Sequence, residues 1–207
     1  MFTELSLAEF TRRLADGQPT PGGGSASALA GAMGAGLVSM FCNLAIGKKK
    51  YAAVQVEMEE AAAAANRWRG RLVELVDLDS EAYAKVLAAN RLPKETEAEK
   101  AARREAMDAA TLIATRTPLE TAACCVAALE LVPPLVAKGN PNALSDLKVG
   151  MELLFTAFTG ARANVEINLP WLPQAAAAEI TEELSPLIAK AEALVAEGRE
   201  EISRLQA

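Results

Sequence analysis

The sequence of 207 residues contains no histidine, and only 4% of its residues are aromatic. Without histidine, a Ser-His-Asp triad is excluded, and any proton transfer must use Asp, Glu, Lys, Tyr, Cys or water. Because aromatic residues are few, the core must be built from Ala, Leu, Val and Met. We interpret Trp68 and Trp171 as packing residues. A chain rich in Ala, Leu and Glu with few β-branched runs is typical of all-α proteins.

Positive charge and cysteine are also scarce. The formal net charge of −6 argues against general nucleic-acid binding, although it leaves room for a local basic site that binds a small anion. The three cysteines form no CxxC pattern and are odd in number, which favours a reducing, cytoplasmic compartment: Cys42, Cys124 and Cys125. The first residues, MFTELSLAEF, have no basic region followed by an apolar run, so we expect no signal peptide.

Helix signals follow one another along the chain, and no strand pattern of useful length interrupts them. Ser6 and Glu9 form a capping box for a first helix that should end near Ala15. A second capping box, TEAE, begins at Thr96. The sequence TPLE predicts another helix start, with Thr117 as the N-cap and its proline at the first helical position.

Four more helices are predicted from composition and periodicity. They run from about Gly24 to Ile46, from Ala52 to Asn90 (one long helix or two nearly collinear ones), from Ala143 to Val165, and from Gln174 toward the C-terminus with a kink at Pro186. We therefore predict an all-α fold. It should be a single up-and-down helical bundle of long helices, with residues 1–207 forming one domain.

The segment PTPGGGSASALAGAMGAGLVSMFCNLAIGKKKY (19–51) has no charged side chain from Pro21 to Gly47. Its length suits a membrane span flanked by lysines. Gly, Ala and Ser dominate it, however, and Asn43 lies within it, so we interpret it as a buried helix. The phosphate-loop pattern G-x-x-x-x-G-K-[ST] is not met, because Lys49 follows Gly47-Lys48. The small residues suit close helix contact inside a bundle or across a dimer.

Both ends of this helix carry groups that suit a binding site. The N-terminal end offers free backbone N–H groups at the positive pole of the helix dipole: Gly22, Gly23, Gly24 and Ser25. Three lysines follow the other end: Lys48, Lys49 and Lys50. The lysines either serve a site or only complement the dipole. The two ends are more than about 30 Å apart, so one compact ligand cannot touch both within one chain.

Asp79 interrupts an apolar stripe on the predicted helix 52–90, so it should be partly buried. The stripe is Trp68, Leu72, Leu75, Val76, Tyr83, Val86 and Leu87. A buried carboxylate must be paired or hydrogen-bonded, and its pKa can rise. Asp79 is therefore either a functional acid or a structural one satisfied by a tyrosine or the backbone. Asp77 lies off the stripe, and we expect it to be solvated.

Asp146 lies in the first turn of its predicted helix, where an acid commonly complements the dipole. Its helix face continues as a strip of mostly small residues with amides at the far end: Gly150, Leu153, Ala157, Gly160, Ala161, Asn164 and Asn168. Asp146 and Asn164 are roughly 27 Å apart along a helix, so one small ligand cannot touch both from one chain. An antiparallel second copy would join the two ends, which predicts a site at a dimer interface.

Four segments in order resemble the cyclodeaminase/cyclohydrolase family over nearly the whole chain. They are residues 19–51, DSEAY (79–83), GNPNALSD (139–146) and NVEINL (164–169). The resemblance implies an all-α homodimer that binds tetrahydrofolate derivatives near the subunit interface, with no metal or redox cofactor. From the charge and composition described above, we expect no nucleic-acid or membrane partner. Lys148 departs from the small residues that similar proteins tend to have there, which bears on substrate choice.

The resemblance further implies hydrolysis of 5,10-methenyltetrahydrofolate to 10-formyltetrahydrofolate. Asp146 is expected to stabilise the substrate cation and accept a proton from water, with Asp79 as partner acid or orienting group. Lys48 is the third expected catalytic residue. The expected substrate contacts are Gly22, Gly23, Gly24, Ser25, Asn43, Lys49, Lys50, Tyr83, Ser145, Asn164 and Asn168.

Two alternatives stay open. The first is formiminotetrahydrofolate cyclodeaminase activity, in which N10 attacks the formimino carbon and ammonia leaves. The stand-alone length and the sequence AIGKKKY favour the cyclohydrolase. The second is a non-catalytic helical scaffold or regulatory dimer, which would have no need for a buried Asp79 or a Gly-rich helix start.

Overall fold

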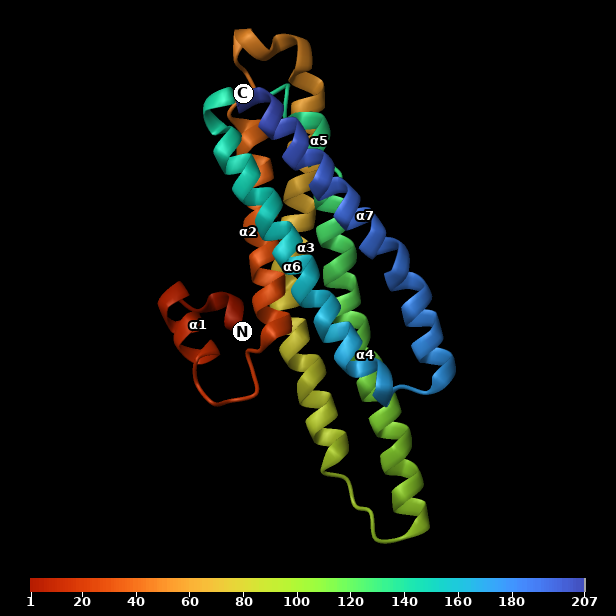
Figure 1. The fold of residues 1–207 in the computed structure, drawn as a ribbon. Coiled ribbons are helices and arrows are strands. Elements are labelled where there is room, and N and C mark those ends of the chain that lie inside the picture. Colours follow the sequence, from red (N-terminus) through yellow and green to blue (C-terminus); the bar gives the residue numbers. More distant parts are fainter. Residues whose placement is uncertain (207) are drawn as a thin grey trace.

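The computed structural model describes residues 1–206, and Figure 1 shows long helices that run side by side. The α-helices are α1 (Leu7–Leu14), α2 (Gly23–Asn43), α3 (Gln55–Asn90), α4 (Glu97–Leu129), α5 (Val132–Leu135), α6 (Leu144–Asn168) and α7 (Gln174–Gln206). Short 3-10 turns are η1 (Phe2–Glu4), η2 (Lys49–Val54), η3 (Pro141–Ala143) and η4 (Leu169–Trp171). No strand occurs among the described residues, and the prediction of an all-α fold is confirmed.

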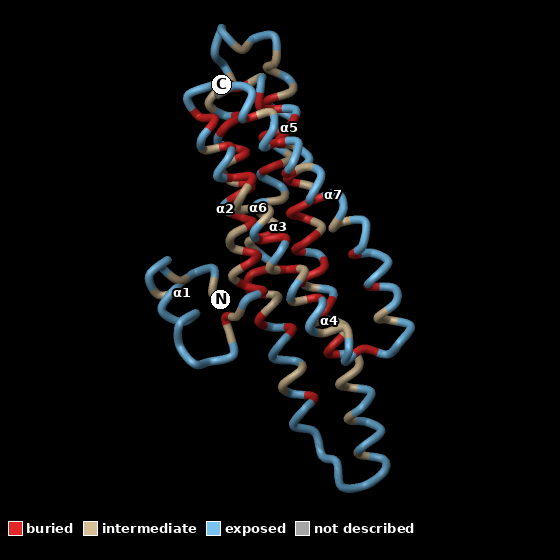
Figure 2. Tube along the Cα trace, in the orientation of Figure 1, coloured by how far each residue is buried: buried red, intermediate tan, exposed pale blue. Residues whose placement is uncertain are grey.

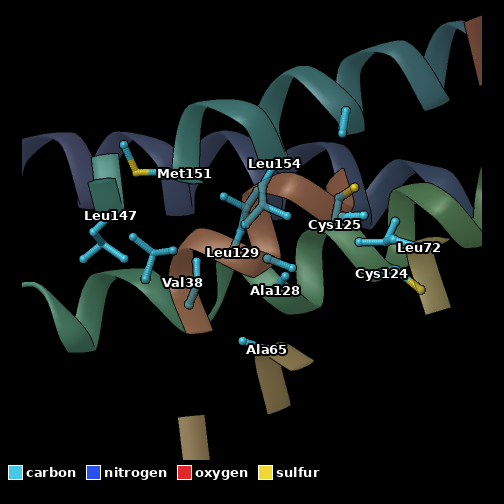
Figure 3. Close-up of a cluster of buried hydrophobic side chains, with 14 of the residues drawn as sticks. Val38, Ala65, Leu72, Cys124, Cys125, Ala128, Leu129, Leu147, Met151 and Leu154 are labelled. Carbon is cyan, nitrogen blue, oxygen red and sulfur yellow. The ribbon is translucent and has the colours of Figure 1, made fainter. Parts of the chain in front are cut away.

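Helices α2, α3, α4 and α6 form the body of the bundle, with α2 packed on α3 and α6, and α4 packed on α3 and α6. Helix α7 lies along α4 and α6, while α1 lies beside the N-terminal end of α2 (Figure 1). Buried residues follow the inward sides of the helices, and the far end of the α3–α4 hairpin is exposed (Figure 2). Figure 3 shows Val38, Leu129 and Leu154 in the core where three of these helices meet.

Glycine permits the close approach of α2 and α6. A Cβ atom on Gly34 would lie 2.7 Å from the carbonyl oxygen of Gly150, and a Cβ atom on Gly150 would lie 3.0 Å from the carbonyl oxygen of Gly34. Near the start of α2, a Cβ atom on Gly23 would approach Asn164. The two helices are therefore antiparallel, with the beginning of α2 beside the end of α6.

Two segments are long and apolar enough to cross a membrane, namely α2 and residues Glu97–Leu135. Inside the bundle, however, 61% and 67% of their most apolar windows are buried. The interpretation of α2 as a buried core helix agrees with this packing, because its small residues contact neighbouring helices.

The helix start predicted at Thr117 was wrong. Helix α4 runs unbroken from Glu97, where the predicted capping box at Thr96 is confirmed, and Pro118 lies inside it. A proline cannot donate to the carbonyl four residues earlier. Here the side-chain Nδ2 of Asn168 donates to that carbonyl, on Ala114, at 3.1 Å. A tertiary contact thus satisfies the acceptor that the proline leaves free.

Asp77 was expected to be solvated, and this prediction was also wrong. Its carboxylate is only 8% exposed and accepts hydrogen bonds from the backbone N–H of Phe2 and, at 2.6 Å, from the hydroxyl of Thr3. The N-terminal turn η1 folds back onto α3 and covers it. Helix periodicity alone cannot reveal this contact, because the two segments are far apart in sequence.

We expect Gly34→Ala to lower the free energy of unfolding by about 1–3 kcal/mol, because its methyl group would collide with the backbone of α6. Thermal unfolding measures this loss as a fall of about 2–12 °C in Tm. The control is Gly70→Ala in α3, where a Cβ atom meets nothing within 4 Å. That variant should gain up to about 1 kcal/mol from helix propensity. An unchanged Tm for Gly34→Ala would contradict the packing argument.

Candidate functional site

A cavity of about 800 Å³ lies beside the N-terminal end of α2, between α3, α4 and the last turns of α6. This volume is within the usual range for small-molecule sites. Seven of the predicted site residues line it: Gly22, Gly23, Gly24, Asp79, Tyr83, Asn164 and Asn168. Residues far apart in the sequence are thus brought together at one end of α2.

Asp79 lies against the first turn of α2 because residue 24 is glycine. A Cβ atom on Gly24 would lie 2.0 Å from the nearer Asp79 oxygen, so no larger residue fits there without displacing the carboxylate. The Ser25 hydroxyl donates to Asp79 at 2.9 Å and is also within hydrogen-bonding distance of the Val76 carbonyl and of Ser80. This cluster fixes the position of the carboxylate.

Ser25 was predicted to contact substrate, but in the structure it does not line the cavity. The residue is fully buried, at 0% exposure, and is not among those lining the cavity. Its hydroxyl donates to the Oδ2 of Asp79. Ser25 is therefore a positioning residue for Asp79.

Burial raises the pKa of Asp79, and the hydrogen bonds from the hydroxyl and backbone N–H of Ser25 offset this rise in part. The prediction that Asp79 is partly buried is confirmed. A carboxyl group whose pKa is shifted toward neutrality exchanges protons more readily at physiological pH. Asp79 can therefore act as an acid or base toward a molecule in the cavity.

The cavity wall is rich in hydrogen-bond acceptors. Two carboxylates line it, Asp79 and Asp108, and none of the described residues that line it is Lys or Arg. The side-chain Nδ2 of Asn164 donates to the carbonyl oxygen of Gly160 at 2.8 Å, and that of Asn168 donates to the backbone of α4. Such a wall suits a ligand that is cationic or that carries several N–H donors.

Helix α4 and the turn η4 supply lining residues that the sequence did not reveal. These are Met107, Asp108, Thr111, Ala114 and Trp171. The spacing of the first four places them on one face of α4, but the sequence does not show which helix this face packs against. Trp171 was expected to be a packing residue, but it is 75% exposed and lies at the cavity rim, so that interpretation was wrong.

The other predicted site residues lie at the opposite end of the bundle, where α2 ends and α6 begins (Figure 1). They are Asn43, Lys48, Lys49, Lys50, Ser145 and Asp146. The three lysines and Ser145 are exposed, Asp146 is half-buried, and Ser145 lines a separate hollow of about 330 Å³. Helix α2 separates the two groups by about 30 Å. Within one chain, Asp146 therefore cannot act with Asp79.

The described residues include no group of three or more Cys, Asp or Glu side chains arranged to hold a metal ion. The family model described as formiminotransferase-cyclodeaminase matches residues 6–186. The chain belongs to the formiminotransferase-cyclodeaminase family. All residues that line the large cavity lie within the part that matches this family. The resemblance seen in the four sequence segments is confirmed.

Named relatives in this family include enzymes of two kinds. The methenyltetrahydrofolate cyclohydrolase of Methylorubrum extorquens is 40% identical over 190 residues, 91% of each chain. The formimidoyltransferase-cyclodeaminase of Rattus norvegicus is 33% identical over 166 residues, which are 80% of this chain but only 31% of the rat protein. The crystal structure of formiminotetrahydrofolate cyclodeaminase from Thermotoga maritima is 28% identical, with a TM-score of 0.89 over the whole of both chains.

The raised pKa of Asp79 predicts a pH-dependent contribution to stability. A carboxyl group with a higher pKa in the folded than in the unfolded state contributes less stability as pH rises through that interval. Asp79→Asn removes this titration, so the variant should gain stability relative to the wild type as pH rises above the ordinary Asp range of about 4. Urea unfolding at several pH values measures the difference. Glu81→Gln, which alters an exposed acid on α3, is the control, and a pH-independent difference for Asp79→Asn would contradict the assignment.

Proposed function

We propose that this protein hydrolyses 5,10-methenyltetrahydrofolate to 10-formyltetrahydrofolate as a homodimer. The observation that carries the proposal is a cavity lined by two carboxylates and, among the described residues, by no basic side chain. The substrate suits this wall because it holds one carbon between two nitrogens as a cationic amidinium. The 40% identical cyclohydrolase, which matches this chain over 91% of both lengths, supports the same choice of reaction.

The chemistry requires only carboxylates and water, with no metal or redox cofactor. A water oxygen forms a bond to the amidinium carbon, and a carboxylate takes the proton that the water loses. The bond from that carbon to N5 then breaks as the new hydroxyl group loses its proton and becomes the formyl C=O. N5 receives one proton, one proton is released to solvent, and the formyl group stays on N10. Carboxylates near the carbon also stabilise the cationic substrate.

A second copy of the chain would complete the site. Helices α2 and α6 expose apolar side chains, among them Met33, Met40, Val149 and the cavity-lining Ile167. Covering these helices with an antiparallel second copy would bury these side chains and place the end that carries Asp146 beside the cavity. Each dimer would then hold two equivalent sites, and each site would use both ends of the bundle.

In this arrangement, Asp146 is the base that activates water, and Asp79 is the acid or orienting group. Lys48 stabilises the developing oxyanion, while Lys49 and Lys50 meet the anionic glutamate tail. The remaining contacts are made by Gly22, Gly23, Gly24, Tyr83, Asn164 and Asn168 at one end and by Asn43 and Ser145 at the other. We place the protein in a reducing cytoplasm, because Cys42, Cys124 and Cys125 are free and buried.

Formiminotetrahydrofolate cyclodeaminase activity is the second candidate. The Thermotoga maritima structure, which bears that name and covers the whole chain, favours it. So does the raised pKa of Asp79, because this reaction must protonate a leaving ammonia rather than activate water. Both reactions centre on the same carbon and fit the same cavity. A non-catalytic scaffold is the third candidate.

The near-ultraviolet absorbance of methenyltetrahydrofolate gives a direct assay. The purified protein should accelerate its loss, and Asp146→Asn and Asp79→Asn should each lower kcat/KM about 100- to 10,000-fold, because general acid–base groups contribute on that scale. Glu81→Gln should retain activity. Appearance of the same absorbance band from formiminotetrahydrofolate would instead identify a cyclodeaminase. Absence of heat on titration with any folate analogue would favour the scaffold.

A shared site predicts complementation between two inactive variants. In a hybrid dimer of Asp79→Asn and Asp146→Asn chains, one of the two sites keeps both carboxylates. Random mixing after joint refolding makes half of the dimers hybrids, so the mixture should recover about one quarter of wild-type activity. No recovery, or a monomer in sedimentation at the assay concentration, would contradict the dimer.

A further inference from the structure

Asp108 is a carboxylate that has no bonding partner among the described residues. It lies on α4, is half-buried and lines the large cavity, yet it makes no hydrogen bond or ion pair with any described residue. By contrast, Glu120 on the same helix pairs with Arg71 at 2.6 Å. Asp108 is thus available to a ligand.

The antiparallel pairing of α3 and α4 defines where Asp108 lies along the cavity. Arg71 meets Glu120 and Asn90 meets Arg103, so in this register Asp108 lies opposite residues 83–85, and Tyr83 and Asp108 both line the cavity. Tyr83 is one turn, about 6 Å, from Asp79 along α3. Asp108 therefore lies about 6–9 Å further along the helix axis than Asp79, the carboxylate assigned to the reaction at this end of the bundle. Both carboxylates line the same cavity of about 800 Å³, which is large enough to hold a bicyclic ring system.

Charge decides which part of a folate can occupy this region. The glutamate tail is anionic and would be repelled by Asp108, and no basic side chain among the described lining residues would offset that repulsion. The pterin carries two adjacent N–H donors, at N3 and at the 2-amino group, on the side of the ring system away from N5. A carboxylate accepts two parallel hydrogen bonds from such a pair.

We propose that Asp108 recognises the 2-amino-4-oxopyrimidine edge of the pterin by accepting hydrogen bonds from N3–H and the 2-amino group. This contact orients the folate so that its N5–carbon–N10 bridge faces Asp79 and its tail leaves the cavity toward the lysines of a second copy. The buried Thr111, one turn along α4 on the same wall, adds a hydroxyl beside this edge. The inference rests on the proposed function and names how the same site selects its substrate.

The test compares two ligands on variants of the full-length protein by titration calorimetry. The ligands are 5-formyltetrahydrofolate and its analogue in which a methyl group replaces the 2-amino group. The wild type should bind the amino compound about 10- to 100-fold more tightly, because one charge-assisted hydrogen bond is lost with the analogue. In Asp108→Ala, affinity for the amino compound should fall by at least this factor, and the two ligands should then bind within about twofold of each other.

Glu105→Gln removes an exposed acid from the same helix without touching the cavity and should keep the wild-type preference. Because Asp108 has no partner in the described chain, its removal should leave Tm nearly unchanged. If the alanine variant fails to fold, Asp108→Asn permits the same comparison and should also lose most of the preference. Retention of the full preference by either variant would overturn the inference alone. If the wild type binds neither ligand, both the inference and the proposed function fail.

Discussion

The contact between Asp79 and the first turn of α2 is the constraint on which the candidate site depends. The absence of a side chain at Gly24 lets the carboxylate reach the helix end, and the Ser25 hydroxyl holds it there at 2.9 Å. Burial at this contact raises the pKa of Asp79. One glycine thus determines the position of the acid and, through burial, its proton affinity. The cavity beside it is formed by helices that pack around this contact.

The antiparallel packing of α2 and α6 leaves the predicted site residues in two sets at opposite ends of the bundle. One set surrounds Asp79, and the other includes Asp146 and the three lysines. Gly34 and Gly150 allow backbone contact and hold the two helices antiparallel. A site that draws on both sets must therefore be intermolecular. The same two helices expose Met33, Met40 and Val149. They therefore keep the two sets of polar residues apart within one chain and also offer an apolar surface on which a second chain could bring the sets together.

Features that depend on local sequence were predictable, whereas those that depend on tertiary contacts were not. Capping at Ser6 and Thr96 and the burial of Asp79 follow from short-range patterns and hold in the structure. The η1 contact that buries Asp77 joins segments about 75 positions apart, which no periodicity encodes. Asp108 was missed for the same reason, because its environment depends on how α4 pairs with α3. Of the candidate site, Asp79 and Tyr83 on α3, the glycines of α2 and the two asparagines of α6 were foreseen, whereas Asn90, Ile167 and the α4 wall were not.

The hydrogen bond from Asn168 to the Ala114 carbonyl has a consequence for what the cavity presents to a ligand. Pro118 has no N–H and so leaves that carbonyl without its usual helical donor. With any other residue at 118, the helix backbone would donate to the same acceptor and compete with the amide of Asn168, which lines the cavity. A proline inside a neighbouring helix therefore sets the polarity of a ligand-facing side chain, and substitutions there can retune specificity without touching the ligand.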